Sequence, residues 1–191
     1  MNIAIVGATG NVGRKTLEVL EKKGLTLGNL YLVASSKSAG KKIHFQGKDI
    51  VVSELENFDF SKVKIAFFAA GGKISEKFAE KAAKHCLVID NSSFFRMDPD
   101  VPLIVPQVNS DALNNIKKNI IANPNCSTAQ LVIALKPLHD LFVIKRIVVS
   151  TYQSVSGAGK ASMDELIKQT KLALDGKDCL LYTSPSPRDR G

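Results

Sequence analysis

Three evenly spaced glycines, Gly7, Gly10 and Gly13, constrain the fold more than any other feature of this sequence. They lie between residues 2–6, a largely apolar segment that predicts a strand, and residues 11–23, whose apolar positions recur at helical spacing. Glycines between a strand and a helix permit a tight turn, let the backbone approach a pyrophosphate and pack the helix closely on the strand. The run predicts a dinucleotide-binding loop. The alternative is a tight turn without a ligand.

Strand and helix patterns alternate through most of the chain, which predicts an α/β fold with a largely parallel sheet. Further strands are expected over residues 31–34, 65–69, 87–90 and 144–151, and another strand is expected to end at Ile121. A hairpin is expected over residues 43–52. Further helices are expected over residues 74–84, from Cys126 onward and over 160–174.

The segment after the second predicted strand favours NADP over NAD. An NAD enzyme usually carries Asp or Glu near this strand end, where the carboxylate binds the ribose 2′-hydroxyl. The sequence instead has Ser35, Ser36, Lys37 and Ser38. Hydroxyls, backbone N–H groups and a cation suit a 2′-phosphate. A solvent-exposed Ser/Lys loop is the alternative interpretation.

Cys126 lies between an apolar strand and an apolar helix. Pro124 interrupts the chain there, and Asn125 or Ser127 can cap the helix start. A thiol at a helix N-terminus faces free N–H groups that favour an anion, and hence the thiolate form. Together with the glycine loop, this suggests thioester chemistry coupled to hydride transfer; the alternative is a half-buried small residue at a turn. The helix is expected to bury Leu131, Val132, Leu135 and Leu138.

Composition narrows the class of protein further. The 191 residues leave room for one full domain and part of another. The net charge of +8 suits anionic metabolites, but the basic residues are scattered, so we expect no nucleic-acid partner. No apolar run reaches the ~20 residues that span a bilayer. The N-terminus lacks signal-peptide features. Cys86, Cys126 and Cys179 have no metal-ligand spacing, and their odd number argues against a disulfide framework, so we expect no metal and a cytoplasmic location.

Five segments together resemble the aspartate-semialdehyde dehydrogenase family. The resemblance runs from Met1 to about Gly176, and the order and spacing of the segments are highly specific. The segments are GATGNVG at 7–13, SSKSAGK at 35–41, DNSSFFR at 90–96, NPNCSTAQ at 123–130 and QSVSGAGK at 153–160.

The resemblance implies a role for each of these segments. Cys126 would attack the acyl carbon of L-aspartyl 4-phosphate, and NADPH would reduce the thioester to L-aspartate 4-semialdehyde, a step in lysine, threonine and methionine biosynthesis. Arg96 would hold the substrate phosphate, Asn125 would position the acyl group or its oxyanion, and Gln153 would orient the substrate beside the thiol. The cofactor contacts would be Gly7, Thr9, Gly10, Asn11, Val12, Gly13, Ser35, Ser36, Lys37, Ser38, Ser156 and Gly157.

The domain organisation follows from the same resemblance. We expect an NADP-binding Rossmann-like domain over residues 1–122, then the start of a second α/β catalytic and dimerisation domain over 123–178. The Ser-, Pro- and Arg-rich residues 179–191 are interpreted as a non-native tail. The family's acid/base histidine and carboxylate-binding arginine are not matched, so we expect a truncated chain that is inactive alone. The full-length protein would be a homodimer or homotetramer. The alternatives are a related acyl-phosphate reductase, such as N-acetyl-glutamyl-phosphate reductase, or a non-catalytic nucleotide-binding fragment.

Overall fold

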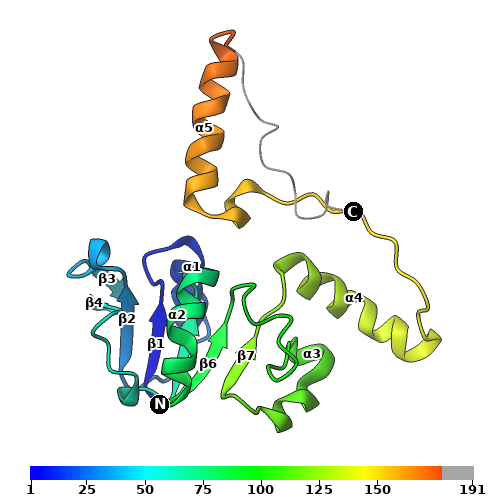
Figure 1. Cartoon of the computed structure of the whole chain (residues 1–191), viewed down its shortest axis with the longest axis horizontal. Helices are drawn as coiled ribbons and strands as arrows, with labels where there is room; N and C mark the ends of the chain where they lie inside the picture. Colours follow the sequence, from blue (N-terminus) through cyan, green and yellow to red (C-terminus); the bar gives the residue numbers. More distant parts are fainter. Residues whose placement is uncertain (178–191) are drawn as a thin grey trace. The chain divides into compact units, whose positions relative to one another are not determined.

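The computed structural model describes residues 1–177 and divides the chain into two units (Figure 1). The first unit is Met1–Val149, and the second begins at Ser150. The predicted tail, residues 179–191, lies outside the described residues. The predicted domain boundary after residue 122 stays a prediction.

The elements follow the predicted alternation of strands and helices through the first unit. The strands are β1 (Ile3–Val6), β2 (Leu30–Ala34), β3 (Lys42–Phe45), β4 (Lys48–Glu54), β5 (Ile65–Phe68), β6 (Leu87–Asp90) and β7 (Ile120–Ala122). The α-helices are α1 (Asn11–Lys22), α2 (Gly72–Ala83), α3 (Pro106–Asn109), α4 (Cys126–Phe142) and, in the second unit, α5 (Lys160–Leu174). The 3-10 helices are η1 (Ser36–Ser38), η2 (Phe60–Lys62), η3 (Ser110–Asn115) and η4 (Val155–Ala158).

One seven-stranded sheet forms the centre of the first unit, in the order β3-β4-β2-β1-β5-β6-β7. All neighbouring strands run parallel except β3 and β4, which form the predicted antiparallel hairpin. The prediction of an α/β fold with a largely parallel sheet is therefore confirmed.

Helices α1 and α2 cover opposite faces of this sheet. Successive side chains of a strand point to opposite faces. Ile5 of β1 accordingly belongs to an apolar cluster with Leu17 of α1, whereas Ala4 belongs to a second cluster with Phe78 and Ala79 of α2. The two clusters bury the middle of the sheet between two helical layers, which leaves its strand ends and their loops to form a site.

Two expectations about the chain after β7 are wrong. Residues 144–151 form no strand, because no neighbouring strand pairs with them in the described part of the chain. The apolar residues of α4 are not buried, and Leu138 is 49% exposed. Residues Pro106–Asn109 form the short helix α3, with Pro106 in its first turn.

The second unit contains η4 and α5, so the predicted helix over residues 160–174 is confirmed. Ser154 precedes η4, and its hydroxyl accepts a hydrogen bond from the N–H of Ser156 at 3.4 Å. Gly159 has a φ of +95°, a conformation that favours glycine, and it separates η4 from α5.

Candidate functional site

The carboxyl ends of four parallel strands lie level along one edge of the sheet. Val6, Phe68, Asp90 and Ala122 form one register row across β1, β5, β6 and β7. Because neighbouring strands are about 4.8 Å apart, the loops after β1 and β7 begin about 14 Å from each other. Each following residue continues the hydrogen-bond ladder: Ala69 N–H donates to Val6 O at 2.8 Å, Asn91 N–H to Phe68 O at 2.9 Å and Asn123 N–H to Asp90 O at 2.8 Å.

The strand order reverses beside β1. The chain passes from β1 to β2 on one side and later returns to β5 on the other side of β1. In open α/β sheets, ligands bind in the crevice outside the strand ends at this point. Both α1, which follows β1, and α2, which follows β5, begin there. The topology therefore places the glycine loop at the expected ligand crevice.

The glycine loop is folded so tightly that side chains are excluded. Gly7 has a φ of +87°, and a Cβ there would lie 2.8 Å from the carbonyl carbon of Ala69. A Cβ at Gly13 would collide with the carbonyl oxygen of Gly7. Gly10 donates its N–H to that same oxygen at 3.0 Å and precedes α1 without a side-chain cap. The first turn of α1 also carries no acidic side chain, so its N-terminus suits a diphosphate.

The serine-rich turn after β2 lies against this loop. Ser35 precedes η1, and Ser38 ends it. The Thr9 hydroxyl, from the glycine loop, donates to the Ser38 hydroxyl at 3.3 Å. The side chains of Ser35, Ser36 and Lys37 are exposed. The structure thus brings together the two segments that the sequence predicts to bind the cofactor.

Arg96 joins the loops that follow β6 and β7. Its Nε donates to the carbonyl oxygen of Asn123 at 2.9 Å, and its Nη2 donates to that of Asn91 at 3.3 Å. The Asn123 amide donates to the Asn91 side-chain oxygen at 2.6 Å. The half-buried guanidinium is therefore held beside the segment that leads to Cys126.

Cys126 is the first residue of α4, and its side chain is exposed. Asn125 precedes the helix, and its side-chain oxygen accepts from the N–H of Ser127 at 2.9 Å. This identifies Asn125 as the cap, one of the two candidates that the sequence left open. The Cys126 carbonyl accepts from the Gln130 amide at 3.2 Å, within the first turn. The thiol is thus fixed at a capped helix N-terminus and remains accessible.

A buried carboxylate lies beneath the loop after β6. Asp90 accepts hydrogen bonds from Ser75 of α2 and from Ser92. Asp90, Asn91 and Asn123 are not among the site residues that the sequence predicted. One feature of the sequence could have identified this network: Asp90 is a charged residue at the end of the otherwise apolar segment 87–90. A charged side chain is buried only where other groups form hydrogen bonds or ion pairs with it.

The remaining predicted site residues, Gln153, Ser156 and Gly157, belong to the second unit. The Gln153 side chain lies so close to Gly157 that a Cβ at Gly157 would collide with it. Their predicted roles toward substrate and cofactor stay predictions.

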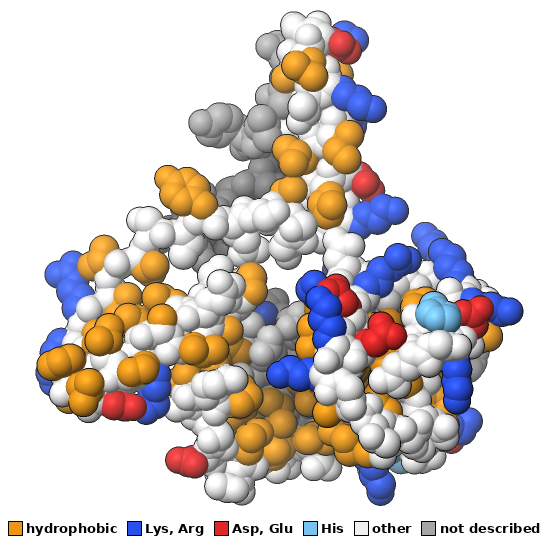
Figure 2. Space-filling view, turned by 180° about the vertical axis from the view of Figure 1, so that it is seen from behind, with side chains coloured by type: hydrophobic (Ala, Val, Ile, Leu, Met, Phe, Trp, Pro, Cys, Tyr) orange, Lys and Arg blue, Asp and Glu red, His pale blue; other side chains and the backbone are white. Residues whose placement is uncertain are grey.

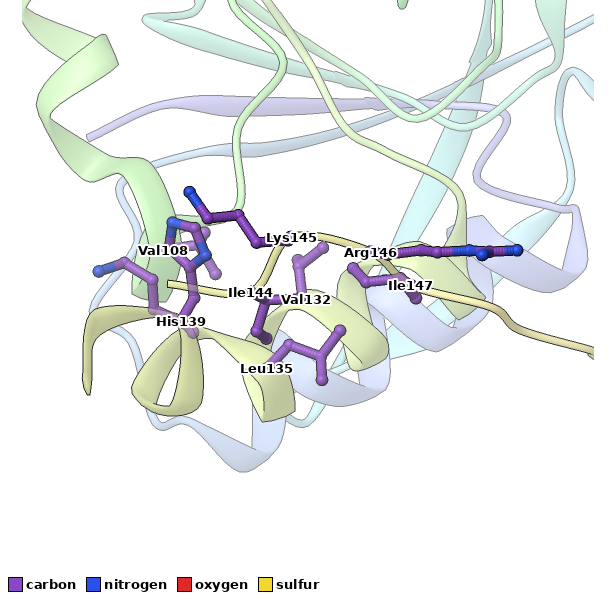
Figure 3. Close-up of a pocket in the computed structure, with 9 residues that line it drawn as sticks. Val108, Val132, Leu135, His139, Ile144, Lys145, Arg146 and Ile147 are labelled. Atoms are coloured by element: carbon purple, nitrogen blue, oxygen red, sulfur yellow. The ribbon is translucent and has the colours of Figure 1, made fainter. Parts of the chain in front are cut away.

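A pocket of about 350 Å³ lies between α4 and the extended segment that follows it (Figure 3). Hydrophobic side chains also gather on the surface of this part of the first unit (Figure 2). Leu141 and Phe142 are each 74% exposed, and Val148 is 81% exposed. The pocket is lined by Val108, Val132, Leu135, Lys136, His139, Ile144, Lys145, Arg146 and Ile147.

Neither a metal centre nor a membrane span is present in residues 1–177. Within this range, no three His, Cys, Asp or Glu side chains come together as a metal site. The helices described there are too short or too polar to cross a bilayer.

Two family models match the chain in sequence order. Residues 2–116 match the semialdehyde dehydrogenase NAD-binding domain. Residues 135–185 match the semialdehyde dehydrogenase dimerisation domain. This order confirms the prediction of a Rossmann-like domain followed by the start of a second domain.

Curated relatives carry the same family name. The chain is 53% identical over 172 residues to an aspartate-semialdehyde dehydrogenase of Rickettsia bellii, covering 89% of this chain and 51% of the relative. It is 53% identical over 177 residues to aspartate-semialdehyde dehydrogenase 2 of Vibrio cholerae, covering 92% and 52%. The chain spans about half the length of the curated relatives it matches.

Solved structures agree with these matches. A crystal structure of aspartate semialdehyde dehydrogenase II from Vibrio cholerae, complexed with ASA, has a TM-score of 0.89 and 50% identity, covering 97% of this chain and 56% of that chain. An aspartate semialdehyde dehydrogenase with NADP from Candida albicans has a TM-score of 0.57 and 31% identity, covering 75% and 48%.

Proposed function

The chain belongs to the semialdehyde dehydrogenase family, and from this premise we propose that it contributes the cofactor site and the reactive cysteine of an NADPH-dependent aspartate-semialdehyde dehydrogenase. The observation that carries the proposal is the accessible Cys126 thiol at the N-terminus of α4, on the sheet edge that also bears the glycine loop. The reaction is the reductive dephosphorylation of L-aspartyl 4-phosphate to L-aspartate 4-semialdehyde, a step in lysine, threonine and methionine biosynthesis.

The residues at the crevice fit a nicotinamide dinucleotide. Gly7 and Gly13 have no side chains, and a Cβ at either position would collide with nearby backbone atoms. The loop can therefore pack tightly, and a pyrophosphate can approach the N-terminus of α1. Thr9, Asn11 and Val12 belong to the same loop and first helical turn. When bound, the reduced nicotinamide supplies a hydride to the acyl group.

The serine-rich turn supports NADP as the cofactor. Ser35, Ser36 and Lys37 offer exposed hydroxyls and a cation, and Ser38 bonds to the glycine loop. A 2′-phosphate is a doubly charged acceptor that such groups bind well. The NADP-complexed relative from Candida albicans supports the same assignment.

The first chemical step uses the thiolate of Cys126. Its sulfur forms a bond to the acyl carbon of aspartyl 4-phosphate, and the carbon–oxygen bond to phosphate breaks, which releases inorganic phosphate. Arg96 binds the phosphate oxygens while they leave, since a guanidinium matches their geometry. Asn125, beside the thiol, orients the acyl oxygen.

The second step begins from the thioester on Cys126. A thioester accepts hydride more readily than a carboxylate, so the acyl carbon becomes a thiohemiacetal bound to the same sulfur. Loss of the hydroxyl proton and breakage of the carbon–sulfur bond then release the aldehyde and restore the thiolate. We propose that Gln153 orients the substrate during this step, and that Ser156 and Gly157 contact the cofactor.

We propose a second copy of the chain as the protein partner, in a homodimer or a tetramer built from dimers. Leu141 and Phe142 are exposed, and they lie in the part that matches the dimerisation domain, as does most of the pocket in Figure 3. Apolar patches of this kind mark protein interfaces. We also propose a cytoplasmic location, where Cys86 and Cys126 stay reduced.

The acylation half-reaction tests the proposed function. The chain is incubated with aspartyl 4-phosphate, and peptide masses locate the acyl group. The expected result is an adduct on Cys126 that is absent from Cys126→Ser and retained in Cys86→Ala. Equal labelling of Cys126→Ser, or a preference for N-acetylglutamyl phosphate, would contradict the proposal.

A further inference from the structure

Asp90 is a charged residue in a place where charge is unfavourable. It ends β6, its exposed fraction is 0%, and it forms no ion pair with any residue of the described chain. A buried carboxylate needs hydrogen bonds in place of water. Ser75 Oγ donates to its Oδ1 at 2.6 Å, the Ser92 N–H donates to Oδ1 at 3.1 Å, and Ser92 Oγ donates to Oδ2 at 2.7 Å.

These donors come from two elements that border the candidate site. Ser75 lies in the first turn of α2, the helix that begins at the crevice. Ser92 lies in the loop formed by residues 91–96. An ionised carboxylate accepts on both oxygens, whereas an amide or hydroxyl in its place would present a donor to at least one of these groups. Asp90 is therefore suited to hold α2 and the loop together.

The loop that Asp90 holds leads to Arg96. The Ser92 hydroxyl also accepts a hydrogen bond from the N–H of Phe94 at 3.1 Å. This bond fixes the backbone of the loop as far as Phe94. Arg96 then bonds to the carbonyl oxygens of Asn91 and Asn123 through Nη2 and Nε. Its Nη1 has no hydrogen-bond partner in residues 1–177, so one nitrogen of a fixed guanidinium stays available to an anion.

We propose that Asp90 is a positioning residue, which fixes the 91–96 loop through Ser75 and Ser92 and thereby holds Arg96 beside the segment that leads to Cys126. The inference rests on the proposed function, in which Arg96 binds the substrate phosphate. Asp90 itself contacts no substrate; removing its donors would displace the Arg96 guanidinium and leave the thiol in place.

The test compares two alkylating agents at Cys126. Iodoacetate is an anion and iodoacetamide is neutral, so the ratio of their rates reports the local positive charge and cancels changes in the thiol itself. Arg96→Gln is expected to lower this ratio by about threefold or more, the effect of one nearby unit charge. Ser92→Ala and Ser75→Ala are expected to lower it toward the Arg96→Gln value. Ser93→Ala, at an exposed neighbour in the same loop, is expected to leave it unchanged.

A second readout follows Arg96 directly. The Nε–H of Arg96 is bonded to Asn123, so its NMR signal is expected to exchange slowly with water, and to exchange faster in Ser92→Ala and Ser75→Ala. Ser92→Thr keeps the hydroxyl and is expected to restore both readouts. NADPH affinity, measured on each variant, is expected to stay within about twofold of the unaltered chain, because these serines do not line the glycine loop.

The outcomes separate this inference from the proposed function. If Arg96→Gln leaves the iodoacetate-to-iodoacetamide ratio unchanged, the assignment of Arg96 as the phosphate-binding group is wrong. If Arg96→Gln lowers the ratio but neither Ser92→Ala nor Ser75→Ala changes the ratio or the Arg96 signal, the positioning role of Asp90 is overturned and the proposed function stands.

Discussion

The Thr9 hydroxyl donates to the Ser38 hydroxyl at 3.3 Å, so a side-chain hydrogen bond joins the glycine loop after β1 to the serine-rich turn after β2. The turn therefore has a defined place beside the proposed pyrophosphate site. Lys37 lies on it, next to Ser38, with an exposed side chain. Cofactor preference is thus expected to depend on this turn.

Replacing Lys37 tests the proposed 2′-phosphate contact. Lys37→Ala removes a cation near the phosphate, so the Kd for NADPH is expected to rise by about three- to tenfold, while the Kd for NADH stays the same. Titration of each cofactor by calorimetry measures both constants. Lys48→Ala removes the same charge from the exposed start of β4 and serves as the control. Equal loss of NADH affinity in Lys37→Ala would contradict the assignment.

A methyl group at Gly13 is expected to disrupt the glycine loop. Its Cβ would collide with the carbonyl oxygen of Gly7, and backbone cannot move aside as a flexible side chain can. Gly13→Ala is therefore expected to destabilise the first unit by about 1–3 kcal/mol and to weaken NADPH binding. Urea unfolding followed by circular dichroism measures the loss.

Gly72→Ala provides the matched control for this substitution. Gly72 also begins a helix at the crevice, but its Cβ would meet nothing closer than Phe94 Cβ at 4.0 Å. Alanine favours helix there, so this variant is expected to be as stable as the unaltered chain or slightly more so. Similar destabilisation by both variants would show that the steric argument for Gly13 is wrong.

The sequence predicted the local features of the site well. The conformation of the glycine loop is determined by residues close together in the sequence. The same holds for the cap of α4, for which Asn125 and Ser127 were both candidates. The contacts of Asp90 and Arg96 could not be predicted in this way. Ser75 and Asp90 are 15 residues apart, and Arg96 and Asn123 are 27 residues apart, so only the register of β5, β6 and β7 brings them together.

The errors concern residues that depend on distant partners. Residues 144–151 have a strand-like apolar pattern, but a strand needs a neighbouring strand, and no strand of the described sheet pairs with this segment. Leu138 has the spacing of a core position, yet burial requires a covering element, which the described chain does not place over it. Periodicity indicates which side of a segment is apolar and does not specify what covers it.

The ion pair between Asp98 and Lys118 is expected to make stability depend on acid pH. Lys118 Nζ lies 2.8 Å from Asp98 Oδ2, and its hydrogen bond, together with one from the Asp100 N–H, holds the pKa of Asp98 below the ordinary value of 3.8. A carboxyl with a lowered pKa in the folded state stabilises above its unfolded pKa, and this contribution is lost as pH falls through the folded pKa.

Lys118→Met is accordingly expected to lower the urea midpoint at pH 6, with the difference from the unaltered chain vanishing toward pH 2. Lys117→Met is the control, because the Lys117–Asp100 pair is more exposed, at 56% and 45%, than the Lys118–Asp98 pair, at 38% and 23%. Its effect is expected to be smaller. A difference for Lys118→Met that persists unchanged to pH 2 would contradict the ion-pair explanation.

The two described cysteines are expected to differ sharply in reactivity. Cys126 is exposed, whereas Cys86 is buried, and burial raises the pKa of the Cys86 thiol from 9.0 to about 11. In a Cys179→Ser background at pH 8, iodoacetamide is expected to label Cys126 and to spare Cys86 until urea unfolds the chain, because the thiolate is the nucleophile. Peptide mass spectrometry locates the label, and equal labelling of both in the folded chain would contradict the burial of Cys86.

The same shift predicts the alkaline behaviour of the fold. A thiol whose pKa is raised by folding stabilises fully below its unfolded pKa of 9.0, and the contribution is lost as pH rises through about 11. The unaltered chain is therefore expected to lose more stability between pH 9 and pH 11 than Cys86→Ala, in which that ionisation is absent. Cys126→Ala keeps the buried thiol, so its urea midpoint is expected to fall with pH as that of the unaltered chain does. If Cys86→Ala and Cys126→Ala show the same pH dependence, ionisation of the buried thiol does not limit stability in alkali.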